Sequence, residues 1–320
     1  MNWTTNSGYL TSGALNKMIQ YQAQPRFRFR QFVDIKEAFG KQNGETVNWL
    51  KVANVGTRGG KLIETATMHE TTQALSWGTL TVYEYGNSIP FTYKVDTLSE
   101  FDVKQIVRKG LLDDMIKCMD GEVERQFNGC KLRYVGTTTT GGGVTTNGTA
   151  TLMNTSAFNK YHVRKMVNEL KTRNVPGYGK AGGDYAMICS VEALEGIYDD
   201  LEGIDKYGST GRDRLANGEA GRYYGCRFIE DTYATRVTYD STARTETAKT
   251  WSGLLSKEGY MFGSDTVREA VAVPEEIRMK VTTDYGRSKG LAWYGLLGFQ
   301  LEWNESDGAL GRIIKWDSAA

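Results

Sequence analysis

The feature that most constrains the fold is the stretch from Asp96 to Gly129, which is typical of one long helix. Because steps of four residues overshoot a full turn by roughly 40°, an apolar stripe with that spacing turns around the helix axis. The two ends of the helix must therefore pack against different neighbours. The stripe consists of Val103, Val107, Leu111, Met115, Met119, Val123 and Phe127.

Local signals predict where this helix starts and stops. Thr97 and Glu100 match a capping box, in which two side chains bond free N–H groups of the first turn. Gly129 is placed to adopt the left-handed conformation just past the end. Gly110 and Gly121 each cost about 1 kcal/mol inside a helix, so packing must stabilise it. A core helix of an ordinary domain remains an equal alternative.

Length, charge and cysteine usage narrow the class of protein. The chain has 320 residues, enough for one large domain or two ordinary ones. Its net charge of +1 argues against a dedicated nucleic-acid binder. No apolar run approaches the ~20 residues that span a bilayer, and the N-terminus lacks a signal-peptide pattern. We expect a soluble cytoplasmic α+β protein with reduced core cysteines at Cys118, Cys130, Cys189 and Cys226.

Two alternating runs, 45–54 and 74–86, predict an extended hairpin with a long tip between its strands. An isolated hairpin is marginally stable in water, and this one exposes large aromatic side chains. We therefore expect it to lie on a partner. One face of the second run carries Leu75, Trp77, Thr79, Thr81, Tyr83 and Tyr85.

An arginine-rich segment precedes this hairpin. Arg26, Arg28 and Arg30 alternate with Phe27 and Phe29, which predicts a strand with one cationic and one aromatic face. Two interpretations stay open for this strand. It is either an edge strand over its own core or an arm across a neighbouring subunit, with its arginines against carboxylates or nucleic acid.

The second half of the chain predicts an α/β unit followed by a β ribbon. A Gly/Thr-rich flexible loop at 135–156 precedes a helix at 155–174, capped by Thr155 or Ser156. A buried strand at 182–190, a helix at 191–202, a charged loop at 203–225 and a strand at 226–233 follow. The ribbon turns at 284–290. Its last strand shows one apolar face of Leu291, Trp293, Leu297, Phe299, Leu301 and Trp303.

The sequence offers little for catalysis or metal binding. His69 starts a motif that lacks the second histidine of a zinc helix, and we expect His162 at the surface or boundary of its helix. No nucleophile elbow or dinucleotide fingerprint occurs. A solvated acidic helix end explains Asp199, Asp200, Glu202 and Asp205 better than a cation site does.

The order of the parts resembles the major capsid protein of tailed double-stranded-DNA bacteriophages, the Hong Kong 97-type fold. That family has an N-arm, an extended E-loop, a spine helix, an A-domain and a P-domain. Residues 79–103 look like an E-loop return strand that leads into the spine helix. Residues 218–232, with Gly221 and Gly225, resemble an A-domain phrase, and 293–303 are similar to the closing P-domain strand. The resemblance extends from about residue 25 to 315.

The resemblance implies an α+β fold with five segments. They are an N-terminal arm (1–44), an E-loop hairpin (45–95), a P-domain spine helix and loop (96–154), an A-domain (155–275), and a P-domain β ribbon with the C-terminus (276–320). It implies a coat protein of the virion, assembled in the host cytoplasm, that forms hexamers and pentamers of an icosahedral head. We expect no enzymatic activity, cofactor or metal.

The resemblance also implies partners. These are other copies of the chain, a separate scaffolding protein, a portal protein at one vertex, and packaged double-stranded DNA bound without sequence specificity. A decoration or cement protein is an optional further partner, no membrane is involved, and no large cleavage is expected. The candidate intersubunit residues are Arg26, Arg28, Arg30, Trp49, Arg58, Lys61, Trp77, Tyr83 and Tyr85.

Two other functions stay open on the sequence. An encapsulin-type nanocompartment shares the fold and would enclose an enzyme cargo in place of a genome. A cytoplasmic α+β enzyme would need a catalytic constellation that the sequence does not reveal.

Overall fold

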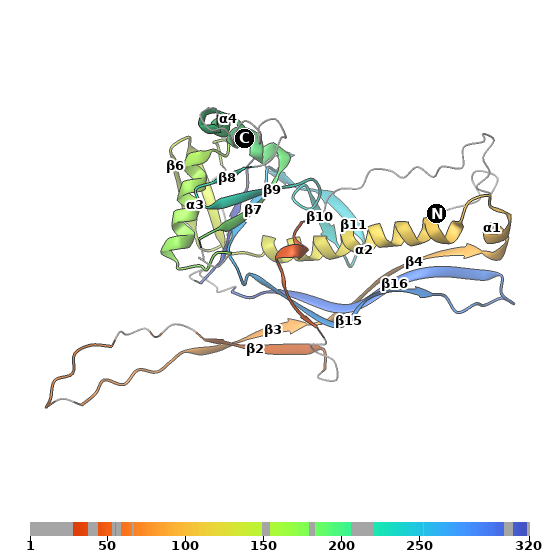
Figure 1. The fold of residues 1–320 in the computed structure, drawn as a ribbon, viewed down its shortest axis with the longest axis horizontal. Helices are drawn as coiled ribbons and strands as arrows, with labels where there is room; N and C mark the ends of the chain where they lie inside the picture. The colour runs from red at the N-terminus through yellow and green to blue at the C-terminus, as the bar shows by residue number, and fades with distance from the viewer. Residues whose placement is uncertain are drawn as a thin grey trace.

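A helix of 26 residues, α2 (Val103–Asn128), runs along the long axis of the molecule and organises the rest of it (Figure 1). The computed structural model describes residues 28–37, 44–52, 55, 59–65, 67–148, 154–178, 183–205, 221–251, 253–303 and 310–318. Within these residues, a four-stranded sheet follows α2 along one side, and a seven-stranded sheet lies at its C-terminal end (Figure 1). The predicted α+β class is confirmed.

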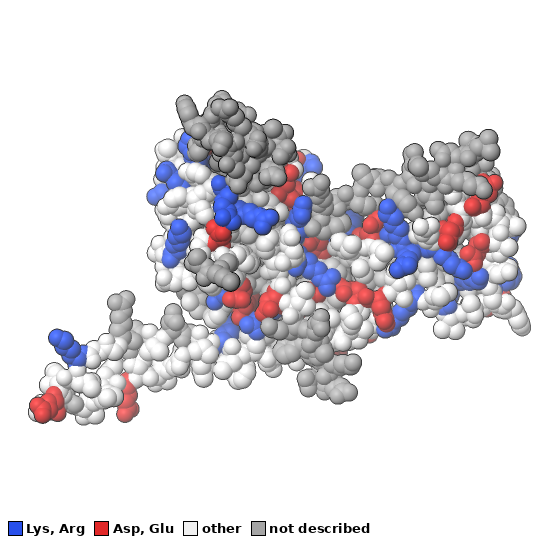
Figure 2. Space-filling model, in the orientation of Figure 1, with Lys and Arg blue, Asp and Glu red and all other residues white. Residues whose placement is uncertain are grey.

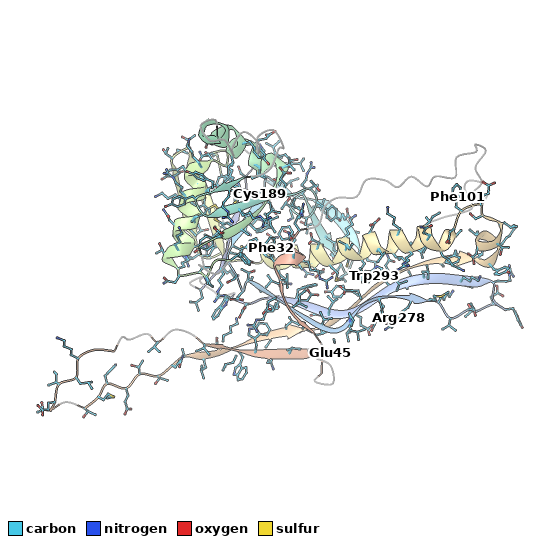
Figure 3. The ribbon with its side chains drawn as sticks, in the orientation of Figure 1. Phe32, Glu45, Phe101, Cys189, Arg278 and Trp293 are labelled. Atoms are coloured by element: carbon cyan, nitrogen blue, oxygen red, sulfur yellow. The ribbon has the colours of Figure 1, made fainter. Side chains whose placement is uncertain are left out.

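The four-stranded sheet lies against the N-terminal half of α2. Its order is β1 (Asp34–Glu37), β15 (Val267–Met279), β16 (Ser288–Leu301) and β4 (Tyr83–Thr92). The predicted β ribbon is the antiparallel pair of β15 and β16, with its turn at positive-φ Asp284 and Tyr285. In Figure 3 Trp293 of β16 points toward α2, where its Nε1 donates to Asp114 at 2.8 Å. The predicted apolar face is buried along β16, and Trp303, which lies beyond the end of the strand, is half-buried.

The seven-stranded sheet forms the second layer together with two helices. Its order is β6 (Gly141–Thr145), β5 (Leu132–Thr138), β17 (Ile313–Trp316), β14 (Gly259–Phe262), β7 (Tyr185–Ser190), β9 (Cys226–Asp231) and β8 (Arg222–Tyr223). Helix α3 (Lys160–Thr172) precedes β7 in the chain, and helix α4 (Val191–Asp205) follows it. Leu194 and Ile197 of α4 join Met166 and Leu170 of α3 in one core with this sheet. The predicted strands at 182–190 and 226–233 and both predicted helices are confirmed.

The small remaining elements complete the described structure. The hairpin of β2 (Thr46–Val52) and β3 (Leu75–Thr81) projects away from the body (Figure 1). Two short antiparallel pairs are β10 (Val237–Asp240) with β11 (Thr245–Ala248) and β12 (Thr250–Trp251) with β13 (Leu254–Leu255). A 3-10 turn, η1 (Arg30–Phe32), and a short helix, α1 (Tyr93–Leu98), precede and follow the hairpin.

The expected helix from Asp96 to Gly129 is wrong at its start, whereas its end just before Gly129 is confirmed and only the left-handed conformation of Gly129 is wrong. The chain forms two helices, α1 and α2, with Ser99 extended between them. The capping box is absent: Asp102 caps α2 by accepting from the N–H groups of Lys104 and Gln105. Thr97 instead donates its hydroxyl to the carbonyl of Tyr93. Gly129 has a φ of −72° and continues the right-handed turn, because its N–H bonds to the Arg125 carbonyl.

The turning apolar stripe on α2 is confirmed. Six of its residues are buried and Met115 is half-buried. Near the C-terminal end, the Phe127 ring contacts Tyr260 and Phe262 of β14 edge-on, with centroids 6.0 and 4.9 Å apart. The N-terminal half instead faces β16 and β4. The two ends of α2 therefore pack against different sheets, as the spacing predicts.

Three smaller expectations about local structure are also corrected. Much of the Gly/Thr-rich stretch forms the β5–β6 hairpin, in which Gly142 leaves room for the Tyr134 hydroxyl 2.6 Å from where a Cβ would stand. Helix α3 is capped by Asn159, not by Thr155 or Ser156. The predicted arginine strand is instead the turn η1 where the structure describes it. The charged loop falls largely at 206–220, outside the described residues.

The expected division into five segments stays a prediction. The boundary after residue 275 falls within β15, and β17 lies between β5 and β14 in the seven-stranded sheet.

Candidate intersubunit surface

The base of the projecting hairpin is anchored on its own protomer. Val47, Trp49, Leu80 and Val82 are buried against Ala270 and Ala272 of β15. Trp49 is 7 % exposed and lies opposite Gly78, where a Cβ would stand 2.3 Å from its ring. The Arg268 guanidinium lies 5.3 Å from the centre of the same ring. The structure thus gives Trp49 an intramolecular packing role.

The opposite face of the hairpin is exposed and apolar. Trp77 of β3 is 69 % exposed. The predicted contacts Tyr83 and Tyr85 lie outside the hairpin, at the start of β4, where Tyr83 is 58 % exposed and Tyr85 is half-buried. Lys61 in the tip is exposed, whereas Arg58 lies outside the described residues. Apart from charges at its tip and base, the hairpin is largely uncharged on the face that Figure 2 shows.

Several exposed apolar residues on the hairpin are missing from the predicted contact set. Leu50 and Val52 alternate with buried Trp49, so the strand periodicity itself points to them as outward-facing. The tip has no periodicity, and its apolar residues could only be found by their exposure. These residues are Leu50, Val52, Leu62, Ile63, Met68 and Leu75.

The arginine-rich segment is held on its own protomer where it is described. The Asp120 carboxylate of α2 accepts hydrogen bonds from the N–H groups of Arg28, Phe29 and Arg30, at 2.8–3.2 Å. These bonds draw the chain into the turn η1 in place of a strand. Burial raises the pKa of Asp120 to about 6. Arg30 forms ion pairs with Glu269 and Glu275 of β15, both at 2.5 Å, and Arg26 lies outside the described residues.

A buried network of charges joins α2 to the seven-stranded sheet. Lys249 contacts Glu124 and donates to Glu258 at 2.7 Å. Lys315 of β17 donates to the same Glu258 at 2.6 Å, and the Tyr260 hydroxyl donates to Glu124 at 2.6 Å. Each of these five side chains is nearly or fully buried. The partners are far apart in sequence, so no local pattern predicts this network.

His162 and the four cysteines are buried side chains. His162 is fully buried, not at the surface, and its Nδ1 and Nε2 lie 3.1 and 3.2 Å from the hydroxyls of Tyr134 and Ser156. Burial lowers the pKa of His162 to about 4. His69 is exposed in the hairpin tip. All four cysteines are buried and free, as predicted for core residues, and burial raises the pKa of each thiol.

The described part of the chain shows neither a cluster of metal ligands nor a membrane-spanning helix. There, no three His, Cys, Asp or Glu side chains gather to hold a metal ion. Asp200 instead pairs with Lys160 and accepts a bond from its backbone N–H. No helix among the described residues is long and apolar enough to cross a bilayer.

Comparisons with known proteins were informative only at the level of structure. No family model and no curated protein matches the sequence. Among solved structures, the capsid of cyanophage P-SCSP1u superimposes with a TM-score of 0.70 at 9 % identity, over 97 % of this chain and 93 % of that one. The chain has the Hong Kong 97-type capsid fold.

Other structures with this fold agree with that assignment. The head of Helicobacter pylori bacteriophage KHP40 matches with a TM-score of 0.68 at 14 % identity, over 100 % of this chain and 98 % of its own. The capsid of a native GTA particle matches with a TM-score of 0.60 at 13 % identity, over 99 % and 98 %. That α2 is a spine helix and the β2–β3 hairpin an E-loop stays a prediction from the sequence.

Proposed function

We propose that this protein is the major capsid protein of a phage head. In this role it associates with copies of itself into hexamers and pentamers of an icosahedral shell around double-stranded DNA. The observation that carries the proposal is the nearly complete coverage in both directions between this chain and capsid proteins of phage heads.

The surface of the projecting hairpin supports self-association. A solvated hairpin gains nothing from exposed Trp77, Leu75 and Ile63, at 59–70 % exposure. Exposed apolar patches of this kind mark interaction sites. The near-zero net charge of +1 also favours assembly, because strongly charged copies would repel one another.

The finer parts of the proposal concern partners and place. A separate scaffolding protein, a portal protein at one vertex and an optional decoration protein would accompany the chain, in a virion assembled in the host cytoplasm. The DNA would be bound without sequence specificity. The role is structural, so the protein would contribute no catalysis and need no cofactor.

Negative-stain electron microscopy tests this function. The protein would be expressed with and without its neighbouring genes, purified and imaged. We expect closed shells or flat sheets of hexamers, and nucleic acid inside the shells would separate a genome container from a nanocompartment filled with an enzyme. A monodisperse monomer or dimer under every condition would contradict the proposal.

A further inference from the structure

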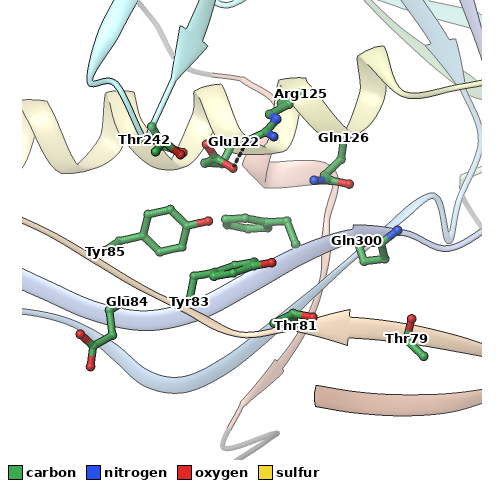
Figure 4. A pocket seen from close by; sticks show the side chains of 12 residues that line it. Thr79, Thr81, Tyr83, Glu84, Tyr85, Glu122, Arg125, Gln126, Thr242 and Gln300 are labelled. Carbon is green, nitrogen blue, oxygen red and sulfur yellow. Dashed lines mark ion pairs between the residues drawn. The ribbon is translucent and has the colours of Figure 1, made fainter. Parts of the chain in front are cut away.

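A pocket of about 550 Å³ lies where the hairpin meets the body of the protomer (Figure 4). One wall is formed by Thr79 and Thr81 of β3 and by the start of β4. The other is formed by the C-terminal half of α2 and the turn between β10 and β11. The pocket therefore brings together β3, β4, α2, the β10–β11 turn and β16.

Glu122 of α2 lines this pocket with an incompletely satisfied carboxylate. Its residue is 4 % exposed, and its Oε1 is buried without a hydrogen-bond partner in the described structure. Its Oε2 lies 3.7 Å from Nη1 of Arg125, beyond hydrogen-bond distance. The Arg125 side chain is itself 60 % exposed. A buried carboxylate oxygen is stable only when a donor satisfies it, and Oε1 of Glu122 has no donor in the described structure.

Aromatic rings face the carboxylate across the pocket. Figure 4 shows Tyr83 and Tyr85 on the side opposite Glu122, and Phe299 of β16 lines the same space. Aromatic faces attract ammonium and guanidinium groups, and the alkyl stems of lysine and arginine pack well on apolar surfaces. A carboxylate above a set of rings thus suits a long cationic side chain.

We propose that this pocket binds a lysine or arginine side chain from a second copy of the chain. The proposal rests on the proposed function, which brings copies into contact. The charged head would donate to Glu122, a charge-assisted hydrogen bond of the stronger kind. Its stem would cover Tyr83, which is 58 % exposed in the protomer. Lys61 in the projecting tip is one exposed cation of the described chain that could enter the pocket.

The first test compares assembly of the wild type, Glu122→Gln and a matched control, Glu276→Gln. Glu276 is an exposed carboxylate on β15 that pairs only with neighbouring Arg278 among the described contacts. We expect Glu122→Gln to raise the protein concentration needed for assembly about tenfold, since a hydrogen bond to a charged group is lost. The control should change it less than about twofold. Normal assembly of Glu122→Gln, or equal losses in both variants, would overturn the proposal.

The second test separates the pocket from the proposed function. Binding of n-butylammonium to the unassembled protein would be followed by saturation-transfer NMR, with thermal melting to verify folding. We expect binding to the wild type and about tenfold weaker binding to Glu122→Gln and to Tyr83→Leu. Equal binding to all three proteins, or none to the wild type, would overturn the pocket. Failure of the wild type to assemble would contradict the proposed function, while the result with this probe would still decide the pocket.

Discussion

Lys249 and Lys315 place two ammonium groups inside the protein against the carboxylates of Glu124 and Glu258. A complete buried ion network contributes little more than apolar residues of the same shape would. Its members nevertheless depend on one another, because removal of one charge leaves the others buried and unpaired. We therefore infer that the network contributes more to how α2 and β14 fit together than to net stability.

Replacement of Lys249 tests this dependence. We expect Lys249→Met to lower the free energy of unfolding by about 3–5 kcal/mol, since Glu124 loses its ammonium partner. Urea denaturation monitored by circular dichroism would measure the change. Lys280→Met is the matched control: the Lys280 side chain donates to Ser288 at an exposed position, and its loss should cost less than about 0.5 kcal/mol. Similar losses in both variants would mean that the network is not interdependent.

The lowered pKa of His162 leads us to expect that the stability of the protein depends on pH. Its pKa is lowered by burial from 6.5 to about 4, so the folded protein keeps it neutral where the unfolded chain binds a proton. Stability should therefore fall as the pH drops from 6.5 toward 4, by at most about 3 kcal/mol. His162→Gln removes this contribution. The free-energy difference between wild type and variant, from urea denaturation, should shrink between pH 7 and pH 4.5. A constant difference would contradict this interpretation.

The wrong prediction for His162 shows that the burial of a polar side chain is hard to predict from the sequence. In sequence, His162 stands in a helix of mixed polarity, and nothing nearby marks it as buried. Its partners, Tyr134 and Ser156, come from β5 and from the segment before α3. Burial of apolar residues such as Val107 and Leu297 follows from periodicity, whereas burial of a polar group depends on distant partners.

Helix α2 illustrates the same division at the scale of an element. The existence of the helix and its turning apolar face follow from spacing alone, because periodicity is a property of neighbouring residues. Its start depends on which residue caps the first turn. Asp102 does so, because its side chain accepts two hydrogen bonds from N–H groups. The turn η1 could not be predicted at all, because the Asp120 carboxylate that bends it lies 90–92 residues further along the chain.

A pair of substitutions distinguishes the two caps. Asp102→Ala should lower the free energy of unfolding by about 1 kcal/mol, because two N–H groups at the start of α2 lose their acceptor. Thr97→Ala removes only an exposed bond within α1 and should change it by less than about 0.5 kcal/mol. Urea denaturation of both variants beside the wild type measures this difference. A larger effect of Thr97→Ala would support the predicted capping box of Thr97 and Glu100.

At the scale of the whole molecule, the order of the elements was predictable and the use of the hairpin was only partly so. Alternation in β2 and β3 identifies two faces of the hairpin, but it does not indicate which face is buried within the protomer. The structure buries the face of Trp49 against β15 and leaves that of Trp77 open. The hairpin is thus anchored at its base and carries exposed apolar side chains, among them Trp77, on its other face, which the sequence could not resolve.

We therefore expect substitutions of Trp77 and Trp49 to have opposite effects on assembly and on the stability of the protomer. Trp77→Ala should leave the free energy of unfolding within about 0.5 kcal/mol of the wild type, because the side chain is 69 % exposed. It should nevertheless prevent shell formation, since an exposed aromatic anchor contributes most when a partner covers it. Trp49→Ala should instead destabilise the protomer by about 3–5 kcal/mol.

Three measurements on each variant decide between these roles: urea denaturation of the protomer, sedimentation of the assembly reaction, and electron microscopy of its product. Trp77→Phe serves as the conservative control and should still form shells, because it keeps an aromatic ring of similar reach. Normal shells from Trp77→Ala would remove the outer face of the hairpin from the intersubunit surface. Assembly would then depend on the pocket beside Glu122 and on surfaces of the body, and the exposed face of β3 would need another partner.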